Sequence, residues 1–472
     1  MIFDVIVVGG GVIGTAIFNK LVRVGKKVAL LDKASDVATG QSKANSALVH
    51  AGYDPAPNTL KAKMNVKGNA LFPALCRRLG VPFKRTGALV GGDDRAMIER
   101  LYARGKENGV KNLFILNREQ ILSLAPDIAD GITAALYAKS AGITSPYLLT
   151  IALADEGILN GGKVFLEEDI KKVEREGEVF KITTLKGEFY TKNIVNSAGA
   201  GYNDISKILK SESYPLTFRR GEYFVFDKNA NFKTSCTLFP LPTKMGKGVL
   251  VTPTVDGNFL VGPTSEDSDE RTITTDAGLT DIKEKSKNIL KNINFKNAIR
   301  QFSGVRVISG EDFIIERSKR QNGVINLAGI CSPGLSSAPA IAEYVVELLG
   351  YKNEEKKNLK ALPKHTLFKN LPITKQRELL RKDKSFGEIV CKCEKITKGD
   401  ILSALNRPLK VHSVDGIKRR TNAGMGICQG GFCFTKVVKM IAKARKIKYE
   451  EVLKENRGSE VALGDIREVE KW

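Results

Sequence analysis

The sequence predicts an α/β protein, α+β overall, in which a Rossmann-like dinucleotide-binding domain is interrupted by an antiparallel-sheet domain and followed by a small α-helical module. Three observations predict this fold class. Residues 2–33 follow the order strand, glycine turn, helix, strand and acid, residues 215–261 alternate apolar and polar side chains, and four of the seven cysteines lie within residues 391–433. At 472 residues the chain is long enough for two or three domains.

The amino-acid composition favours a soluble globular protein over a membrane-spanning one. With 42% hydrophobic and 27% charged residues, the chain is typical of a soluble globular protein with sizeable cores. No apolar run approaches the roughly 18 residues of a membrane span. The first strand begins at once, without room for a signal peptide. We therefore expect a cytoplasmic protein with at most peripheral membrane contact.

The net charge of +23 is concentrated near the C-terminus. Residues 351–472 hold 29 Lys and Arg against 15 Asp and Glu, which is 14 of the 23 charges. The excess is mostly lysine, and no nucleic-acid motif or interleaved aromatic residue accompanies it, so we expect no nucleic-acid partner. A solvated basic surface and an acidic partner protein are the two remaining explanations.

The first 33 residues predict a dinucleotide site. The expected elements are a strand, a helix and a second strand, over Phe3–Val8, Val12–Val24 and Lys27–Leu31. Gly9, Gly11 and Gly14 form G-x-G-x-x-G, which allows a tight turn, close approach of a pyrophosphate and close packing of helix on strand. The helix start at Val12 and Ile13 offers N–H groups to the phosphates. Asp32 can accept hydrogen bonds from a ribose, with Lys33 beside it; the pattern alone does not choose between NAD and FAD.

A loop of small residues, Ala38–Ser46, follows the acid. Ser42, Asn45 and Ser46 can present short donors to a pyrophosphate or a ring edge. His50, one of three histidines, lies just beyond. Histidine can accept a proton near neutral pH, so His50 is a candidate base, and a structural histidine is the alternative.

The middle of the chain is predicted to alternate between the two domains. Helices are expected over Asn58–Gly80, Asp94–Asn108, Arg118–Leu124, from Ser145 onward, Ile273–Ile293 and Ala338–Leu349. Short strands are expected over 164–192, followed by an apolar strand from Asn193 that returns to the nucleotide sheet. There Ala198 and Gly199 let the backbone lie against a cofactor. Antiparallel strands are expected between Pro215 and Val261.

Three longer motifs point to a family. They are Asn45-Ser46-Ala-Leu-Val-His50-Ala-Gly52, Ser303-Gly-Val-Arg306 and Gly329-Ile-Cys-Ser-Pro-Gly-Leu-Ser-Ser337. With the glycine fingerprint, they make the first 350 or so residues resemble the FAD-dependent glycerol-3-phosphate dehydrogenases and oxidases of the D-amino-acid-oxidase superfamily. L-2-hydroxyglutarate dehydrogenase is a close relative of these enzymes. The resemblance implies non-covalent FAD and a substrate pocket between the two domains.

The resemblance also implies roles for single residues. His50 would take the substrate's hydroxyl proton as hydride leaves for the flavin, and Arg306 would anchor an anionic group through two hydrogen bonds. The alternative for Arg306 is an interdomain salt bridge. Ser46 and Ser332 would line the pocket, and Lys244 or Lys247 would add positive charge unless they are surface residues. The helix start at the flavin ring would be formed by Gly329, Gly334, Leu335 and Ser336.

The clustered cysteines form a separate module. Cys391 and Cys393 make C-x-C, and Cys428 and Cys433 make C-x4-C. Four thiolates can close a [2Fe–2S] cluster with two on each iron, although zinc and free thiols are alternatives. The other three cysteines are expected to be small buried apolar residues.

The module resembles the bacterioferritin-associated-ferredoxin type, including Gly424-Met-Gly-Ile-Cys428-Gln-Gly. This resemblance implies a [2Fe–2S] cluster through which electrons leave one at a time. The run Lys418-Arg-Arg420 would add positive charge beside the cluster, or else form an exposed basic turn.

These predictions combine into a division of the chain. The FAD-dependent oxidoreductase domain covers 1–350, with FAD-binding parts about 1–80, 145–205 and 305–350 and substrate parts about 81–144 and 206–304. A linker (351–385), the [2Fe–2S] module (386–441) and a helical tail (442–472) follow. We expect oxidation of sn-glycerol 3-phosphate to dihydroxyacetone phosphate, with electrons passing to a partner redox protein. The alternatives are a 2-hydroxy-acid dehydrogenase, an amine-oxidising enzyme and a redox sensor or scaffold without turnover.

Overall fold

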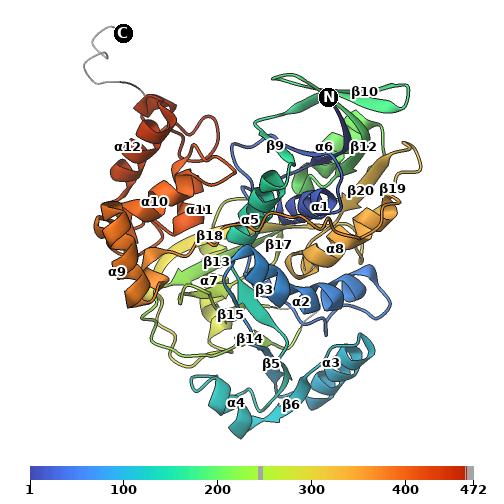
Figure 1. The fold of residues 1–472 in the computed structure, drawn as a ribbon. Helices are drawn as coiled ribbons and strands as arrows, with labels where there is room; N and C mark the ends of the chain where they lie inside the picture. The colour runs from blue at the N-terminus through green and yellow to red at the C-terminus, as the bar shows by residue number, and fades with distance from the viewer. Residues whose placement is uncertain (243–247, 463, 465–472) are drawn as a thin grey trace.

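The computed structural model describes residues 1–242, 248–462 and 464. Figure 1 follows the chain from the N-terminal sheet, through a second sheet at the bottom of the view, to the orange and red C-terminal module on the left. The predicted fold class, a Rossmann-like domain interrupted by a largely antiparallel sheet and followed by a small helical module, is confirmed.

An eight-stranded sheet carries the glycine fingerprint. Five parallel strands lie in the order β9 (Lys163–Leu166), β2 (Val28–Asp32), β1 (Ile2–Val8), β12 (Glu188–Asn196) and β20 (Val324–Ala328). The antiparallel strand β19 (Ile314–Arg317) follows β20, and the hairpin of β10 (Ile170–Glu176) and β11 (Val179–Thr184) pairs with the first half of β12. The two strands expected on either side of residue 193 are therefore one continuous strand.

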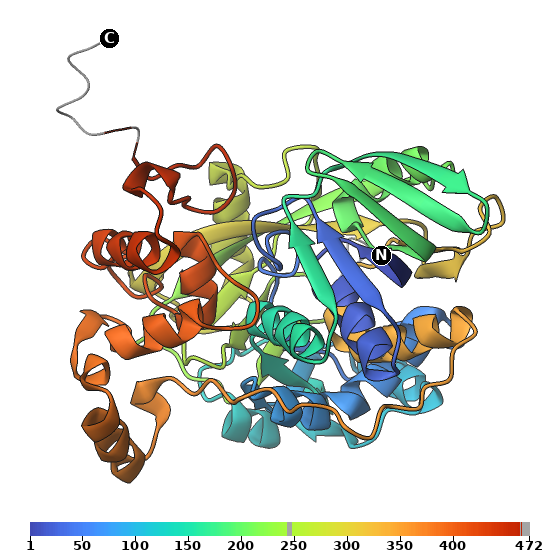
Figure 2. The same cartoon turned by 45° about the horizontal axis from the view of Figure 1, so that its top comes forward.

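Successive side chains of β1 point to opposite faces of this sheet and show what covers each face. Val5 and Val7 belong to a core with the helices, whereas Ile6 and Val8 belong to a core with the β10–β11 hairpin. The helices are α1 (Val12–Arg23), α2 (Leu60–Leu79), α5 (Pro146–Leu159) and α8 (Gly334–Leu348). Helix α6 (Tyr202–Leu209) contributes to the hairpin side. Figure 2 shows the hairpin above the sheet and the helices below it.

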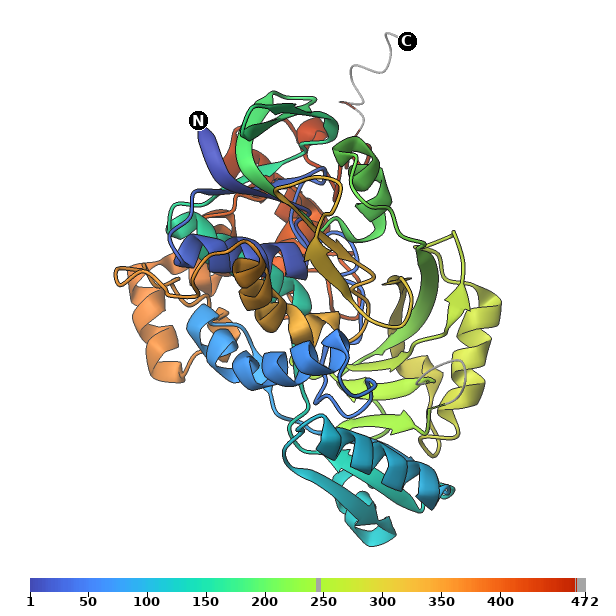
Figure 3. The same cartoon turned by 90° about the vertical axis from the view of Figure 1, so that its right-hand side faces the viewer.

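A nine-stranded sheet forms the second domain. The strands run β17 (Glu266–Asp267), β13 (Thr217–Phe226), β16 (Phe259–Gly262), β15 (Leu250–Pro253), β14 (Thr237–Pro240), β5 (Ala88–Gly92), β7 (Ala134–Ala138) and β6 (Leu113–Asn117), and β18 (Ala298–Ile308) also pairs with β13. The strands predicted between 215 and 261 are antiparallel as expected, but β14 joins β5 in parallel. Helices α3 (Arg95–Glu107) and α4 (Arg118–Leu124) lie at the far end, at the bottom of Figure 3. Helix α7 (Asp276–Ser286) is shorter than the predicted 273–293.

A small three-stranded sheet adjoins the two domains. It consists of β3 (Leu48–Val49), β8 (Gly142–Thr144) and β4 (Phe83–Lys84). Strand β3 immediately precedes His50, so this sheet fixes the chain direction at the candidate base.

The C-terminal module contains a hairpin and three helices around its own core. The elements are β21 (Ile389–Cys391), β22 (Ile396–Thr397), α10 (Lys398–Leu405), α11 (Val414–Thr421) and α12 (Phe434–Arg445). In the linker, the one α-helix within the described residues is α9 (Ile373–Lys382), and Figure 2 shows the chain before it running beside the helices of the first domain.

The tail over 442–472 was expected to be helical, and this prediction is wrong for the described residues after Arg445, apart from one 3-10 turn. Helix α12 ends at Arg445 because Lys446 adopts a left-handed cap with φ +56°. A short 3-10 turn, Tyr449–Glu451, and a loop follow, and Val452 is buried in the core of the module. This segment is therefore part of the iron–sulfur module.

Three buried ion pairs, formed by Asp36 and Asp155, attach the module to the first domain. Asp36 faces Arg419 and Arg420 at 2.9 and 2.6 Å, and Asp155 faces Arg407 at 2.6 Å. The basic run that ends at Arg420 is thus not an exposed turn, and its two arginines serve the domain contact instead of facing the cluster. Within the described ranges, no helix is both long enough and apolar enough to span a lipid bilayer.

Candidate active site and iron–sulfur centre

A cavity of about 1210 Å³ collects nearly all the predicted site residues. It is lined by Gly9, Gly11, Val12, Ile13, Asp32, Lys33, Ser42, Asn45, Ser46, His50, Ala198, Gly199, Arg306, Gly329, Ser332, Gly334 and Leu335. Gly14 and Ser336 do not line it, and Lys247, like Lys244, lies outside the described residues. The cavity extends from the carboxyl ends of β1 and β2 to the neighbouring sheet.

The fingerprint glycines are required by close backbone contacts. Gly9 has φ +106°, and a Cβ there would lie 2.6 Å from the Ser197 carbonyl oxygen. A Cβ at Gly14 would lie 1.9 Å from the Gly9 carbonyl oxygen. Gly14 was predicted to bind the cofactor, but its role here is to let α1 pack against the turn that lines the cavity.

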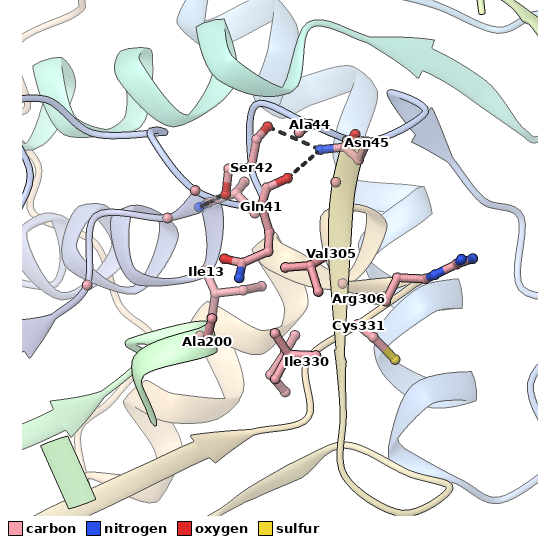
Figure 4. A pocket seen from close by; sticks show the side chains of 18 of the residues that line it. Ile13, Gln41, Ser42, Ala44, Asn45, Ala200, Val305, Arg306, Ile330 and Cys331 are labelled. Carbon is pink, nitrogen blue, oxygen red and sulfur yellow. Dashed lines mark hydrogen bonds between the residues drawn. The ribbon is translucent and has the colours of Figure 1, made fainter. Parts of the chain in front are cut away.

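The acid and the small-residue loop organise the cradle. The Asp32 carboxylate accepts hydrogen bonds from the Gly10 N–H at 2.5 Å and the Ala34 N–H at 2.7 Å. Burial raises the pKa of Asp32, and these two donors oppose that rise. Ser42 Oγ accepts from the Val12 N–H at 2.8 Å, and Asn45 donates to two carbonyls of its own loop, as Figure 4 shows. The glycine turn, the start of α1 and the Asp32 carboxylate therefore fit a dinucleotide such as FAD.

The His50 backbone is held from three directions. Its N–H donates to Ser336 Oγ at 2.7 Å, and its carbonyl accepts from the side chains of Asn65 and Asn69 at 2.7 and 2.9 Å. Ser336 was predicted to touch the cofactor, but it is fully buried and supports His50 instead. The His50 ring lies at the cavity wall, with Nε2 3.3 Å from Ser332 Oγ. The candidate base is thus presented on a rigid support.

Arg306 supplies positive charge at the end of the cavity near Ser332 and His50. Its guanidinium donates to the Thr264 carbonyl oxygen at 2.7 Å, and no carboxylate of the described residues lies within 4 Å. Burial lowers the pKa of Arg306 from its ordinary value. The expected alternative of an interdomain salt bridge is therefore not found, and the guanidinium is available to an anion.

The β18 strand separates two parts of the cavity. Arg306 and Cys331 lie on one side of the strand in Figure 4, and Val305 and Ile330 lie on the other. A Cβ at Gly304 would lie 1.9 Å from the Ala44 carbonyl oxygen, so glycine lets β18 cross directly over the cradle loop. This crossing brings Arg306 near the dinucleotide cradle.

Sequence reasoning missed several residues that line the cavity. They include Gln41, Tyr223, Arg271, Cys331, Asn456 and Arg457. Arg271 stacks over the Phe218 ring at 3.5 Å from its centroid and adds a second guanidinium. Cys331 was expected to be a buried apolar residue, but it is half-buried at the cavity wall because its loop turns into α8. Its place inside the Gly329–Ser337 motif was the available signal. Cys76 and Cys236 are buried as predicted.

The four clustered cysteines converge at the edge of the module. Cys393 and Cys428 have their sulfurs 3.5 Å apart, and Cys391 and Cys433 are buried behind them. The Cys433 thiol and the N–H groups of Gly424 and Glu394 lower the pKa of Cys391. A Cβ at Gly426 would lie 2.4 Å from Cys393 Cβ. The close approach of the backbone to the cysteines, and the N–H groups that point at their sulfurs, fit a cluster held by thiolate ligands.

The family comparisons agree with both sites. Residues 4–348 match the family model "FAD dependent oxidoreductase", and residues 389–443 match "BFD-like [2Fe-2S] binding domain". These matches carry the FAD cradle and all four clustered cysteines.

Similar proteins extend over different parts of the chain. A glycerol 3-phosphate dehydrogenase of Caloramator mitchellensis is 43% identical over 98% of this chain and 99% of its own length. A glycerol 3-phosphate oxidase of Mycoplasma genitalium is 33% identical over 75% of this chain and 96% of its own length. The structure of L-α-glycerophosphate oxidase from Mycoplasma pneumoniae with FAD bound aligns with a TM-score of 0.73 and 31% identity, over 77% of this chain and 99% of that one.

The cradle, the cavity and the cysteine cluster thus agree with the matched families, and the protein is an oxidoreductase with FAD and a [2Fe–2S] cluster as cofactors. This chain belongs to the FAD-dependent oxidoreductase family and carries a BFD-like [2Fe–2S] binding domain after it.

Proposed function

We propose that the protein oxidises sn-glycerol 3-phosphate to dihydroxyacetone phosphate and passes the electrons through its [2Fe–2S] cluster to a partner redox protein. One observation carries the substrate assignment: the His50 ring contacts Ser332, and the preceding residue, Cys331, lies on the same side of β18 as the Arg306 guanidinium, which has no ion pair with a carboxylate of the described residues. The names of the relatives similar to this chain, a glycerol 3-phosphate dehydrogenase and an oxidase, support the same substrate.

Arg306 would bind the phosphate. A guanidinium presents parallel N–H donors that match two phosphate oxygens, and the partial burial of Arg306 strengthens the attraction. Arg271 lies at the same cavity and would add charge. The neighbouring Arg219 is less available because Asp267 holds it at 2.6 Å.

His50 would accept the proton of the secondary hydroxyl. Its backbone is held by Ser336, Asn65 and Asn69, so the ring keeps its place at the cavity wall while the substrate binds. Ser332 Oγ, 3.3 Å from Nε2, would orient the ring or the hydroxyl. FAD, when bound in the cradle, accepts the hydride from the same carbon.

The exposed edge of the cysteine cluster supports transfer to a partner. Cys393 is exposed, and Ile427 and Phe432 beside the ligands are 69% and 80% exposed. Apolar side chains with lysines around them suit a brief contact with an acidic electron carrier. Lys392 and Lys395 flank Cys393 and are exposed.

An anaerobic titration of the purified protein tests the substrate. Bleaching of the flavin band near 450 nm by sn-glycerol 3-phosphate, and not by L-2-hydroxyglutarate or glycine, is the expected result. Bleaching by the hydroxy acid alone would assign the protein to the 2-hydroxy-acid dehydrogenases. No bleaching by any of the three would favour a sensor or scaffold.

Two variants test the assigned roles. His50→Asn should lower kcat by about 10²–10⁴-fold while FAD stays bound, since it removes the base and keeps a polar side chain at this position. Arg306→Ala should raise KM by about tenfold to a hundredfold, because a hydrogen bond to a charged group is lost. Arg219→Ala, at the paired position on β13, is the matched control and should raise KM less. A larger effect at Arg219 would move the phosphate site.

A variant without the cluster tests the electron route. Cys428→Ser should still allow substrate to bleach the flavin but should slow reduction of flavodoxin, used as an acidic one-electron probe. Equal rates with and without the cluster would mean that electrons reach the acceptor by another route.

A further inference from the structure

The loop formed by residues 453–459, here called the C-terminal loop, reaches from the iron–sulfur module to the FAD cradle. The N–H groups of Val414 and Asp415, at the start of α11, donate to the carbonyls of Leu453 and Lys454 at 3.0 and 2.8 Å. The loop closes on itself where the Lys454 N–H meets the Ser459 carbonyl at 2.6 Å. It is therefore a fixed part of the module, and its tip points toward the first domain.

The tip of the C-terminal loop binds the segment that follows Asp32. The Ser35 N–H donates to Asn456 Oδ1 at 3.1 Å, and Ser35 Oγ donates to the Glu455 carbonyl. Lys43, in the same cradle segment, forms an ion pair with Glu455 at 2.5 Å. Asp36, which pairs with Arg419 and Arg420, lies between Ser35 and Lys43 in the sequence.

Asn456 and Arg457 line the same cavity as Asp32 and Gly11. Both residues lie near Asp32. Asn456 contacts Ser35 directly, and Arg457 pairs at 3.1 Å with Glu167, the residue that follows β9. Strands β9 and β2 are neighbours, so Glu167 and Asp32 share one edge of the sheet. An acid at the end of the second strand binds the adenosine ribose in dinucleotide sites.

We propose that the C-terminal loop forms part of the FAD site and binds the adenosine half of the cofactor. Asn456 supplies the hydrogen bond: the Ser35 N–H can face only the amide oxygen, so the amide Nδ2 points elsewhere and has no acceptor among the described residues. A ribose oxygen or an adenine ring nitrogen is an acceptor that it can reach from the cavity wall.

Arg457 supplies a cover for the adenine. Both of its contacts to Glu167, at 3.1 and 3.2 Å, hold the guanidinium at the cavity while the side chain stays 71% exposed. A planar guanidinium stacks on aromatic rings and is weakly hydrated. Its charge also offsets Glu167, Glu168 and Asp169, which line this part of the cavity.

Through this loop, the iron–sulfur module helps the first domain to hold FAD. The shorter oxidases similar to this chain are matched over nearly their whole length by about three quarters of it, so they have no room for a second module and its loop. Because the structure among them with FAD bound manages without this loop, the loop here should add affinity and slow FAD release without being indispensable.

FAD binding to Asn456→Ala, Arg457→Ala and the double variant tests the proposal. The dissociation constant is measured by adding FAD to the apoflavoprotein with its cluster in place, and the release rate by dilution of the holoenzyme. We expect each single change to weaken FAD binding about fivefold to tenfold and the double change to weaken it more. Lys454→Ala is the matched control, since Lys454 lies in the same loop, pairs with Asp415 and does not line the cavity.

Competition with ADP locates the effect within the cofactor. ADP carries the adenosine half alone, so the variants should weaken ADP binding by the same factor as FAD binding. The visible circular dichroism of the cluster reports whether the module is intact, and Asn456→Asp, which keeps the shape but loses the donor, serves if the alanine variant does not fold. Unchanged FAD binding in the double variant, an equal loss in Lys454→Ala, or an effect on FAD without one on ADP would each overturn the proposal.

Discussion

Replacing Asp36 by alanine should weaken the attachment of the iron–sulfur module to the FAD domain. The Asp36 carboxylate receives Arg420 through Nη1 and Nη2 at 2.6 and 2.9 Å and Arg419 through Nη2 at 2.9 Å. The Asp36 and Arg420 side chains are 0% exposed, and that of Arg419 is 4% exposed. This is a buried charge cluster that joins two domains across 384 residues of sequence.

The structure gives the size of the expected effect. Removing one partner of a buried ion pair costs about 3–5 kcal/mol, because the remaining charge stays buried without compensation. Arg419 would keep Glu455 at 2.6 Å, whereas Arg420 would keep only the Gly416 carbonyl at 3.0 Å. Arg419 remains compensated and Arg420 does not, so we expect a loss of at least about 3 kcal/mol. With a urea dependence of about 2 kcal/mol per M, the midpoint for loss of the module should fall by at least about 1.5 M.

The assay is anaerobic urea unfolding followed by the visible circular dichroism of the [2Fe–2S] cluster. Asp415→Ala is the matched control, because it removes an exposed pair with Lys454 and should cost less than about 1 kcal/mol. A midpoint for Asp36→Ala within 0.3 M of the control, a threshold of about 0.6 kcal/mol, would refute the reasoning.

Acid provides a second check on Asp36. Burial alone would raise its pKa, but the two guanidinium groups overcome burial and lower the pKa to about 2. The folded pKa lies below the ordinary value of 3.8, so the pair stabilises the protein fully above about pH 4 and loses this effect as the pH falls toward 2. The difference between wild type and Asp36→Ala should shrink over that interval.

Three further variants test the site and the linker. Gly304→Ala should reduce FAD content and stability, because its Cβ would lie 1.9 Å from the Ala44 carbonyl oxygen; normal FAD content by absorbance would contradict the proposed crossing. Asn65→Ala removes one of the two donors to the His50 carbonyl and should lower kcat about tenfold with FAD retained, as measured by steady-state kinetics; an unchanged kcat would mean that this support is dispensable. Burial lowers the pKa of His365 to about 4, so wild type should lose up to about 1.4 kcal/mol per pH unit as the pH falls from 6.5 to 4; a His365→Leu variant with the same decline in urea midpoint would argue against this.

Local patterns predicted most of the elements and the dinucleotide cradle. The cradle could be recognised because the glycine turn, the closely packed helix and the acid that binds the ribose all lie within 33 residues. Each of them depends on short-range sterics. The cysteine spacing was similarly local. Element ends were less well predicted: α8 begins at Gly334, four residues before the expected Ala338, because the turn at Pro333 places Gly-Leu-Ser-Ser directly into the first turn of a helix packed on β20.

The site depended on both local and distant information. His50 and Arg306 were identified from motifs, but the sequence could not say that Arg306 has no carboxylate partner among the described residues or that Ser336 supports His50. Those facts depend on how β18 and α8 meet the loop after β3, and contacts between elements far apart in sequence have no local signature.

The sequence by itself determined a dinucleotide cradle, a candidate base and a four-cysteine module, since these follow from residue type and short spacing, whereas the choice of FAD and the anchoring role of Arg306 came from the family resemblance. Only the tertiary structure decided which charges are buried and what they face. Arg419 and Arg420 were expected beside the cluster or in an exposed basic turn, yet they are held by Asp36. The segment after Arg445 was expected to be helical, but it forms a loop that contacts the cradle. A charge is buried only when a partner compensates its lost hydration, and that partner is chosen by the fold.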